Sequence, residues 1–284
     1  MRIDSFHKIA KNYKVIFFDS FGVLRNYNGI IPGAQNTFNR LLTEGIDYFI
    51  LTNDASRSPE MLAQSYFDKG FKHIPGDKII SSGMLAREFL RTKIKKGKVV
   101  YLGTKNSAVY IKSIGFDLIN VEDIVFTNDE INQIQAIVLL DDEGYAWRKG
   151  MNNMVNLLRL RNIPVVVANT DFIYPVSDHD IAIATGGIAY LVEKIVGKHF
   201  IRFGKPDVQI FSYAFDHINQ IKDTYKKSDI LMVGDTLTTD IIGANKFGID
   251  TALVLTGNTI PDQADFLIKS SGIIPDYICE SIAD

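Results

Sequence analysis

The amino-acid sequence predicts an α/β protein with a doubly wound parallel sheet at its core and a second α/β segment inserted into it. First, several predicted strands, such as residues 15–18 and 230–233, are wholly apolar and lack the alternation of a half-exposed strand. Second, these strands alternate with helical patterns along the chain. Third, a basic, glycine-containing break occupies residues 93–98, and a separate α/β series begins after it.

The first strand, at residues 15–18, is the reference point for the other elements. Asp19 follows it directly, then Ser20, Phe21 and Gly22, and the glycine permits a sharp turn. Ligands of open parallel sheets bind beyond the carboxyl ends of the strands, where Asp19 is expected to lie. An aspartate at this point can also simply open a turn. The polar residues at the other strand ends decide between the two interpretations.

The remaining elements continue the alternation of strand and helix. Gly45 stands where a helix C-cap glycine is expected, and Pro59 suits the first turn of a helix. Strands are predicted at residues 47–51, 79–82, 99–102, 136–140, 164–168, 200–203, 230–233, 251–255 and 276–279. Helices are predicted at residues 34–43, 59–69, 84–92, 107–114, 145–161, 185–196, 206–218, 238–247 and 261–269.

Length and composition limit the classes of function. A chain of 284 residues with 46% hydrophobic residues can build one large domain or two modest ones. The formal net charge of −2 gives no reason to expect nucleic acid or an acidic membrane as a partner. The single cysteine, Cys279, excludes an internal disulfide and any multi-cysteine metal site. No apolar run has the length of a membrane span, so a cytoplasmic location is expected.

Polar residues of a consistent kind follow several of the predicted strands. If these strands belong to one parallel sheet, their carboxyl ends meet at one edge and the polar side chains can converge. Each feature is common by itself, but their combination and order are specific. The residues concerned are Asp19, Thr52, Asn53, Lys205, Asp235 and Asp240.

These residue types suit the transfer of a phosphoryl group. Carboxylates close together repel one another unless a cation lies between them, and Mg²⁺ prefers oxygen ligands of this kind. A hydroxyl, an amide and a lysine can bind a phosphate, and the lysine also offsets the negative charge of an anionic substrate. An aspartate can act as the nucleophile through an aspartyl-phosphate intermediate.

The sequence resembles the haloacid dehalogenase-like hydrolases. In that family one strand ends in aspartate, a second ends in threonine or serine, a lysine follows, and an acidic motif completes the set. Residues 17–24, 50–53, 204–206 and 234–240 look like these motifs in turn. The resemblance extends over nearly the whole chain.

The segment between the second and third motifs is similar to the cap of the class IIA branch, which contains NagD-type sugar phosphatases and 4-nitrophenylphosphatases. Residues 168–171, 174–175 and 185–187 fall where that branch has similar cap signatures. The resemblance implies a Rossmann-like hydrolase core at residues 1–89 and 201–284 and an inserted α/β cap at residues 90–200. Because caps of this branch often pair, it also admits a homodimer formed through the cap.

The resemblance further implies a Mg²⁺-dependent phosphatase that acts on a small phosphorylated metabolite similar to a sugar phosphate. Asp19 is the expected nucleophile, and Lys205 is expected to take part in catalysis. Thr52 and Asn53, with Lys205, are the expected ligands of the transferring phosphoryl group.

Four residues are the expected magnesium site. The resemblance implies that Mg²⁺ is bound by Asp19, by Asp235 and by the backbone carbonyl of Phe21, with Asp240 in support.

The sequence departs from the family pattern at Phe21. Phosphatases of this family have a second aspartate at that position, which protonates the leaving group. General acid–base catalysis is typically worth about 10²–10⁴-fold, so we expect weakened turnover of alkyl phosphates in particular. Asp54 is one substitute acid, although a carboxylate in that loop more often caps the following helix.

Two other functions remain open at this point. The chain can be a non-catalytic protein that binds a phosphorylated metabolite on the same fold. It can also cleave a bond whose leaving group needs no proton, as the phosphonatases and dehalogenases of the family do. Those enzymes also lack the second aspartate, but they have caps of other types.

Overall fold

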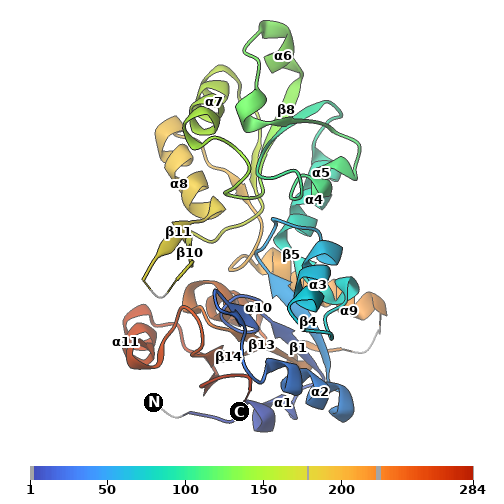
Figure 1. Ribbon diagram of the computed structural model, residues 1–284, viewed down its shortest axis with the longest axis vertical. Helices are drawn as coiled ribbons and strands as arrows, with labels where there is room; N and C mark the ends of the chain where they lie inside the picture. The colour runs from blue at the N-terminus through green and yellow to red at the C-terminus, as the bar shows by residue number, and fades with distance from the viewer. Residues whose placement is uncertain (1–2, 178, 222–224, 284) are drawn as a thin grey trace. The chain divides into compact units, whose positions relative to one another are not determined.

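The computed structural model describes residues 3–177, 179–221 and 225–283, and it divides into two compact units (Figure 1). The first unit consists of Met1–Thr52, Pro59–Ile80 and Lys205–Asp284. The second consists of Asn53–Ser58 and Ser81–Gly204, so it is inserted into the first. The predicted division placed its boundaries at residues 89/90 and 200/201. That the inserted unit acts as a cap stays a prediction.

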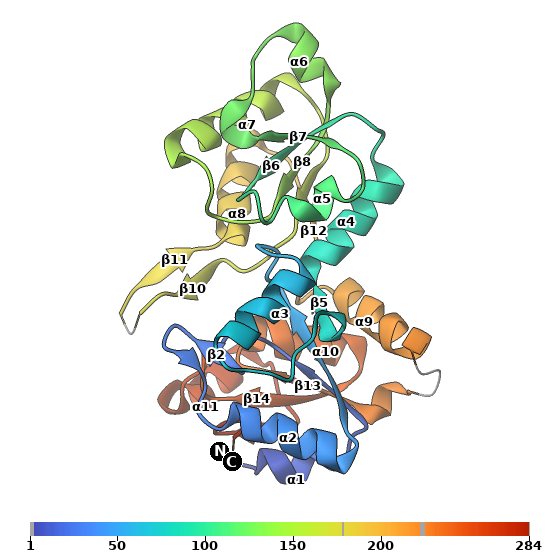
Figure 2. The same ribbon diagram turned by 45° about the vertical axis from the view of Figure 1, so that its right-hand side comes forward.

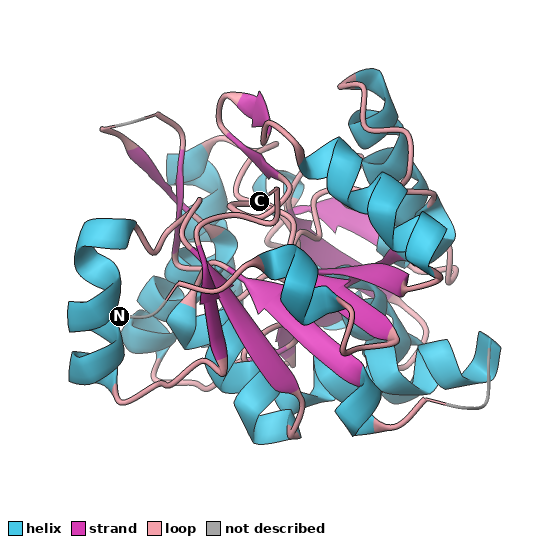
Figure 3. Ribbon diagram, turned by 90° about the horizontal axis from the view of Figure 1, so that it is seen from below, coloured by secondary structure: helices cyan, strands magenta, loops and turns pink. Residues whose placement is uncertain are grey.

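The first unit contains a six-stranded sheet with the order β15-β14-β13-β1-β4-β5. Figure 3 shows its strands with helices around them. The strands are β1 (Val15–Phe18), β4 (Asp47–Thr52), β5 (Ile79–Ser81), β13 (Ile230–Gly234), β14 (Asp250–Val254) and β15 (Tyr277–Cys279), with a separate hairpin of β2 (Arg25–Asn26) and β3 (Gly29–Ile30). The helices are α1 (Phe6–Ala10), α2 (Ala34–Glu44), α3 (Pro59–Asp68), α9 (Val208–Ile221), α10 (Ile242–Phe247) and α11 (Pro261–Ser271).

Strand β1 lies inside this sheet because both of its faces are apolar. All four of its residues are fully buried, as the absence of polar alternation predicts. Phe18 packs on Phe38 of α2, with 5.1 Å between the ring centroids. Phe17, on the opposite face, contacts Phe49 of β4, which in turn lies against His217 of α9. The sheet is therefore covered on both faces, as a doubly wound fold requires.

The order of the strands brings three functional segments to one edge of the sheet. Strand β1 pairs in parallel with β4 on one side and with β13 on the other. After β1 the chain adds β4 and β5 on one side, and it later returns to add β13, β14 and β15 on the other side. The direction in which strands are added therefore reverses at β1. In such sheets the ligand-binding crevice lies at this reversal, beyond the carboxyl ends of the strands. The predicted doubly wound α/β core is confirmed.

The second unit contains a five-stranded sheet with the order β12-β9-β8-β6-β7 (Figure 2). Its described pairs are all parallel. The strands are β6 (Lys98–Leu102), β7 (Asp117–Asn120), β8 (Ile134–Leu139), β9 (Val165–Val167) and β12 (Ile201–Arg202), with a hairpin of β10 (Ile173–Pro175) and β11 (Ile181–Ile183). The helices are α4 (Ser82–Lys93), α5 (Val109–Lys112), α6 (Asn128–Gln133), α7 (Trp147–Leu160) and α8 (Thr185–Val196).

Two details of the strand assignment differ from the sequence expectation. The strand predicted at 200–203 was grouped with the first part of the chain, but β12 pairs with β9 in the second sheet. The segment after Leu24, expected to be a loop, contains the hairpin β2–β3. Its two turn residues are Tyr27 and Asn28, and Gly29, which begins β3, has a φ of 120°. Each strand has only two residues, which is too short for a periodic signal.

None of the helices in the described part of the chain is long and apolar enough to cross a membrane.

Candidate active site

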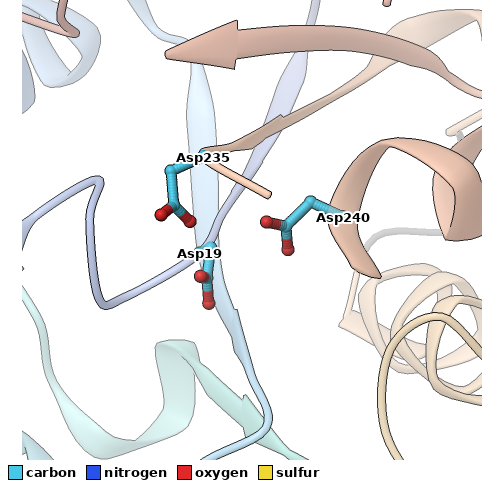
Figure 4. A group of neighbouring side chains, drawn as sticks. All are labelled: Asp19, Asp235 and Asp240. Atoms are coloured by element: carbon cyan, nitrogen blue, oxygen red, sulfur yellow. The ribbon is translucent and has the colours of Figure 1, made fainter. Parts of the chain in front are cut away.

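Three aspartates of the first unit bring their carboxylates together at the carboxyl edge of the sheet (Figure 4). Asp19 follows β1, Asp235 follows β13, and Asp240 lies in the π-helical turn Leu237–Ile241. One oxygen from each lies within 4.8 Å of the others. Asp235 and Asp240 are fully buried, whereas 15% of the Asp19 side chain is exposed. Solvent and ligands can thus reach Asp19 more easily than the other two carboxylates.

Lys205 supplies positive charge to this group. Its Nζ atom lies 2.6 Å from Oδ1 of Asp19 and 2.7 Å from Oδ1 of Asp240. Burial by itself lowers the pKa of Lys205, but the charges of the two aspartates and its hydrogen bonds to them raise that pKa above its usual value. The lysine is therefore a permanent cation although its side chain is almost fully buried.

Asp235 accepts hydrogen bonds, but the negative charges of neighbouring carboxylates disfavour its ionised form. Its Oδ2 accepts the backbone N–H of Asn258 at 2.5 Å, and its Oδ1 accepts the hydroxyl of Thr236 at 3.2 Å. Burial first, and then the charges of Asp240 and Asp19, raise the pKa of Asp235 well above its usual value. A divalent cation would relieve this repulsion, and carboxylate oxygens are the ligands that Mg²⁺ prefers. The residues present therefore fit a magnesium ion.

A loop that the sequence did not indicate closes around Asp235. This loop, residues 256–259, follows β14. The hydroxyl of Thr256 donates to the carbonyl of Gly22 at 2.5 Å, and the N–H of Thr259 donates to the carbonyl of Asp235 at 3.1 Å. A β-carbon added to Gly257 would overlap Oδ2 of Asp235 and the Cα of Gly22. Glycine is needed here because two backbones and a carboxylate meet. In the sequence, Gly257 marks only the end of the preceding strand, because the backbone donors that contact Asp235 have no residue signature.

The two predicted phosphate ligands after β4 fall in different units. Thr52 ends β4 in the first unit and is 5% exposed. Asn53 belongs to the second unit, where its Nδ2 donates to Oγ1 of Thr170 at 3.0 Å and to Oδ1 of Asp171 at 2.9 Å. The side-chain amide of Asn53 is thus hydrogen-bonded to residues of its own unit. Phosphate binding by these two residues stays a prediction.

Asp54, the suggested substitute acid, makes local hydrogen bonds. Its Oδ1 accepts the backbone N–H of Ser56 at 2.9 Å and the Ser56 hydroxyl at 2.6 Å. This pattern matches the capping alternative that the sequence favoured. Like Asn53, Asp54 belongs to the second unit.

The side chain of Phe21 carries no acidic group, and binding of a metal ion by its backbone carbonyl stays a prediction. Its partly exposed side chain has no proton to give, and the guanidinium carbon of Arg25 lies 6.0 Å from its ring centroid. The next residue, Gly22, has a φ of 82° and packs against Asp235. The turn therefore holds Gly22, the residue after Phe21, against Asp235, while the side chain of Phe21 cannot act as an acid.

Comparisons with known proteins match most of this chain to one family. The haloacid dehalogenase-like hydrolases match residues 16–117, and the related HAD-hydrolase-like family matches residues 202–284. The two matches include Asp19, Thr52, Lys205 and Asp235. The chain belongs to the haloacid dehalogenase-like hydrolases.

Three relatives show how far the similarity extends. A crystal structure from Cytophaga hutchinsonii, described as a possible sugar phosphatase of this superfamily, is 54% identical with a TM-score of 0.95, and the match covers 100% of this chain and 99% of that one. Mouse chronophin is 27% identical, covering 95% of this chain and 90% of its own. The glycerol phosphate phosphatase Rv1692 from Mycobacterium tuberculosis, in complex with magnesium, is 22% identical with a TM-score of 0.77. The match covers 99% of this chain and 78% of that one.

These relatives place the hydrolase in the class IIA branch, together with NagD and the 4-nitrophenylphosphatases. Several curated relatives are named as phosphatases. The chain is accordingly a phosphoric monoester hydrolase. Both the family and the class of enzyme agree with the sequence prediction.

The second unit of this hydrolase has an acidic group of its own, at the end of β8. Asp141 accepts a hydrogen bond from the Thr104 hydroxyl at 3.2 Å, and Asp142 accepts one from the Tyr174 hydroxyl at 2.9 Å. Burial first, then the charge of Asp142, raises the pKa of Asp141 to about 6. The sequence analysis did not single out these aspartates, although they follow a predicted strand as Asp19 does.

We expect Gly257→Ala to disable the site and also to lower the unfolding free energy, because the added methyl group overlaps a buried carboxylate and a backbone atom. The new methyl group cannot fit unless Asp235 or the Gly22 backbone moves, and a shift of about 1 Å at a reacting group can cost about 10²-fold in rate. Turnover of 4-nitrophenyl phosphate, with the unfolding free energy of the same sample, measures both effects. Gly45→Ala is the control, because no atom lies near its β-carbon position and only its φ of 70° resists alanine, at about 1 kcal/mol. Wild-type kcat/KM in Gly257→Ala would contradict this account of the loop.

We expect Asp141→Asn to stabilise the protein above about pH 6. The folded-state pKa of Asp141 exceeds its ordinary value of 3.8, so its contribution to stability is present at low pH and is lost as the pH rises through about 6. The asparagine stays neutral, so the gain, about 1 kcal/mol after solvent screening, should vanish below pH 3.8. Urea unfolding from pH 3.5 to 8 checks this expectation. The exposed Asp117→Asn is the control, and a gain independent of pH would contradict it.

Proposed function

We propose that this hydrolase is a Mg²⁺-dependent phosphatase of small phosphorylated metabolites, similar to sugar phosphates, and that Asp19 is its nucleophile. The observation that carries the proposal is the position of Asp19. Its partly exposed carboxylate lies at the strand end, beside a buried lysine and two buried aspartates. Relatives named for sugar phosphates and glycerol phosphates support the class of substrate.

In the proposed reaction, a carboxylate oxygen of Asp19 attacks the phosphorus of the monoester. The bond to the leaving oxygen breaks with its electron pair, and an aspartyl-phosphate remains. Water then attacks that phosphorus, the bond to Asp19 breaks, and inorganic phosphate leaves with Asp19 restored. Lys205 orients Asp19 and offsets the charge of the entering phosphate, and Thr52 and Asn53 are the further phosphate ligands we propose.

Asp19, Asp235 and the carbonyl of Phe21 would hold Mg²⁺, and Asp240 would support them. When bound, the ion supplies positive charge that stabilises the negative charge developing on the phosphoryl oxygens. The magnesium in the M. tuberculosis relative supports the choice of ion.

Phe21 determines which leaving groups suit this enzyme. An alkoxide is a poor leaving group unless it receives a proton, and here that proton has to come from solvent because Phe21 has none. A phenolate or an acyl group leaves without that help. We therefore propose that sugar-like alkyl phosphates are turned over slowly compared with aryl or acyl phosphates.

The alternative function is that of a non-catalytic protein that binds a phosphorylated metabolite. Phe21 favours it, because removal of a general acid is one route to loss of activity on this fold. Under this alternative, phosphorylated ligands would stabilise the protein without any release of phosphate.

A substrate panel combined with two substitutions at position 21 tests the proposal. We expect 4-nitrophenyl phosphate to be hydrolysed faster than a panel of sugar phosphates. Phe21→Asp should raise turnover of the sugar phosphates by roughly tenfold or more, because it restores a proton donor. Phosphate release, measured with and without Mg²⁺, gives these rates.

Phe21→Asn is the matched control, since it has nearly the shape of aspartate but no acidic proton. Asp19→Asn should abolish turnover of every substrate. Equal wild-type rates on aryl and sugar phosphates, or full activity of Asp19→Asn, would contradict the mechanism. Thermal stabilisation by ligands without any phosphate release would favour the alternative function.

We also propose that the protein forms a homodimer through the second unit. In the hairpin β10–β11, Ile173 pairs with Ile183 and Pro175 pairs with Ile181, so all four side chains lie on one face of the ribbon. The three isoleucines are 49–62% exposed. Both views show the hairpin extending away from the five-stranded sheet of its unit (Figures 1 and 2). An exposed apolar ribbon of this kind marks an interaction surface.

The apolar face continues onto helix α8. Its residues Tyr190, Leu191 and Ile195 are about half exposed, and the ring of Phe172 lies 5.8 Å from that of Tyr190.

The formal net charge of −2 gives no reason to propose a nucleic acid or a membrane as a further partner. Cys279 is buried and is the single cysteine of the sequence, so no disulfide forms within the chain, which is consistent with the cytoplasmic location that we propose.

We expect the double substitution Ile181→Asp/Ile183→Asp to convert a dimer into a monomer. Two charges on the apolar ribbon face would have to be desolvated in the interface. Sedimentation equilibrium over a range of protein concentrations measures the change in mass. Phe67→Asp, on an exposed residue of α3 in the first unit, is the control and should leave the dimer intact. A wild-type protein that stays monomeric at every concentration would contradict the proposal.

A further inference from the structure

The residue after the proposed nucleophile is held by a buried network of polar side chains. Ser20 is 4% exposed, and its hydroxyl is hydrogen-bonded to the hydroxyl of Tyr66, which is also 4% exposed. The Nε of Arg25 donates to the same serine oxygen at 3.3 Å. Tyr66 belongs to α3 and Arg25 to β2, so two separate elements converge on Ser20.

The backbone around Ser20 is anchored as well. Its carbonyl accepts the N–H groups of Leu24 and Arg25 at 2.9 and 3.2 Å. Two residues further on, the N–H of Gly22 donates to the carbonyl of Arg25 at 2.7 Å. The carbonyl of Gly22 accepts the hydroxyl of Thr256. Phe21 therefore lies between two residues whose positions are fixed by hydrogen bonds.

This arrangement determines where the Phe21 carbonyl points. The direction of a backbone carbonyl depends on the dihedral angles of its own residue and of the next one, so anchors on both sides restrict it. The anchors on the Gly22 side come from the loop 256–259. On the Ser20 side, the side-chain anchor is the pair of hydroxyls of Ser20 and Tyr66.

We propose that Tyr66 is a positioning residue whose hydroxyl, through Ser20, aims the Phe21 carbonyl and thereby sets the affinity of the site for Mg²⁺. This inference rests on the proposed function, because it takes the Phe21 carbonyl as a metal ligand. Mg²⁺ demands nearly octahedral geometry at short distances, so a small rotation of one ligand weakens its binding.

The role of the hydroxyl can be separated from that of the ring. The Tyr66 ring packs in the hydrophobic core of the first unit, with its centroid 6.1 Å from that of Phe71. Phenylalanine at position 66 keeps the ring in this packing and removes the hydroxyl that is hydrogen-bonded to Ser20. A purely structural role of Tyr66 would therefore change stability without changing the affinity for Mg²⁺.

Binding of Mg²⁺ to the whole protein, without substrate, tests the proposal. Isothermal titration calorimetry gives the dissociation constant, and the Mg²⁺-induced rise in Tm gives a second readout. We expect Tyr66→Phe to weaken Mg²⁺ binding by roughly threefold to tenfold, the effect of losing one hydrogen bond. Ser20→Ala should have a similar effect. The double variant should bind no more weakly than Ser20→Ala, since that variant already removes the contact with Tyr66 together with the one from Arg25.

Tyr48→Phe is the matched control. Its hydroxyl is also bonded in the first unit, to the carbonyl of His73, but it makes none of the contacts around Ser20. It should lose stability and keep the wild-type affinity for Mg²⁺. Loss of Mg²⁺ binding in Asp19→Asn would first show that the unmodified protein binds the ion at Asp19. If Tyr66→Phe then binds Mg²⁺ as tightly as the unmodified protein, this inference is overturned and the proposed function is left intact. A wild-type protein that binds no Mg²⁺ would overturn both.

Discussion

The ion pair of Lys205 with Asp19 and Asp240 is the interaction on which the candidate site depends. Three carboxylates close together in a largely buried group repel one another, and burial makes that repulsion stronger. The lysine, 2.6–2.7 Å from two of them, offsets part of this charge and holds Asp19 in place. Carboxylates still outnumber the lysine, so the group is suited to accept a further cation. The same excess of negative charge that costs stability thus prepares the site for Mg²⁺.

The topology of the sheet brings these groups together. Because the winding reverses at β1, the ends of β1, β4 and β13 are neighbours although Thr52 and Asp235 are far apart in the sequence. The buried strands fix the positions of the residues that follow them. The loop 256–259 and the π-helical turn with Asp240 then surround Asp235 from the first unit alone. A rigid sheet with functional residues on its end loops is a common solution for enzymes of this class.

Phe21 is the one position at which the chemistry departs from the family resemblance. Its two neighbours, Ser20 and Gly22, are both anchored by hydrogen bonds, and Gly22 packs against Asp235. Its side chain, in contrast, removes the usual source of a proton for the leaving group. Under the proposed mechanism, the site therefore keeps the residues that would bind and attack a phosphate but lacks the acid that would help an alkoxide to leave. The choice of leaving group, more than the phosphate itself, is where the specificity of this enzyme should lie.

Much of the fold and of the candidate site could be predicted from the sequence because their signals are local. The apolar run at Val15–Phe18 and the aspartate after it are neighbours in the chain, and Asp235 follows a similar run. Such signals determined the α/β class, the doubly wound core and the carboxylates at the strand ends. The hairpin β2–β3 was missed because strands of two residues show no period.

Only the tertiary structure decided the contacts that join distant segments. Thr256 reaches Gly22 across 234 residues, Tyr66 reaches Ser20 across 46, and β12 joins the second sheet rather than the first. Asn53 was predicted, with Thr52, to bind the phosphoryl group, which stays a prediction, and the folded chain shows that its amide donates to Thr170 and Asp171 within the second unit. Every residue except proline has a backbone N–H, and many residues have a hydroxyl, so the sequence does not indicate which group each of them will bond. The partners are known only from the folded chain.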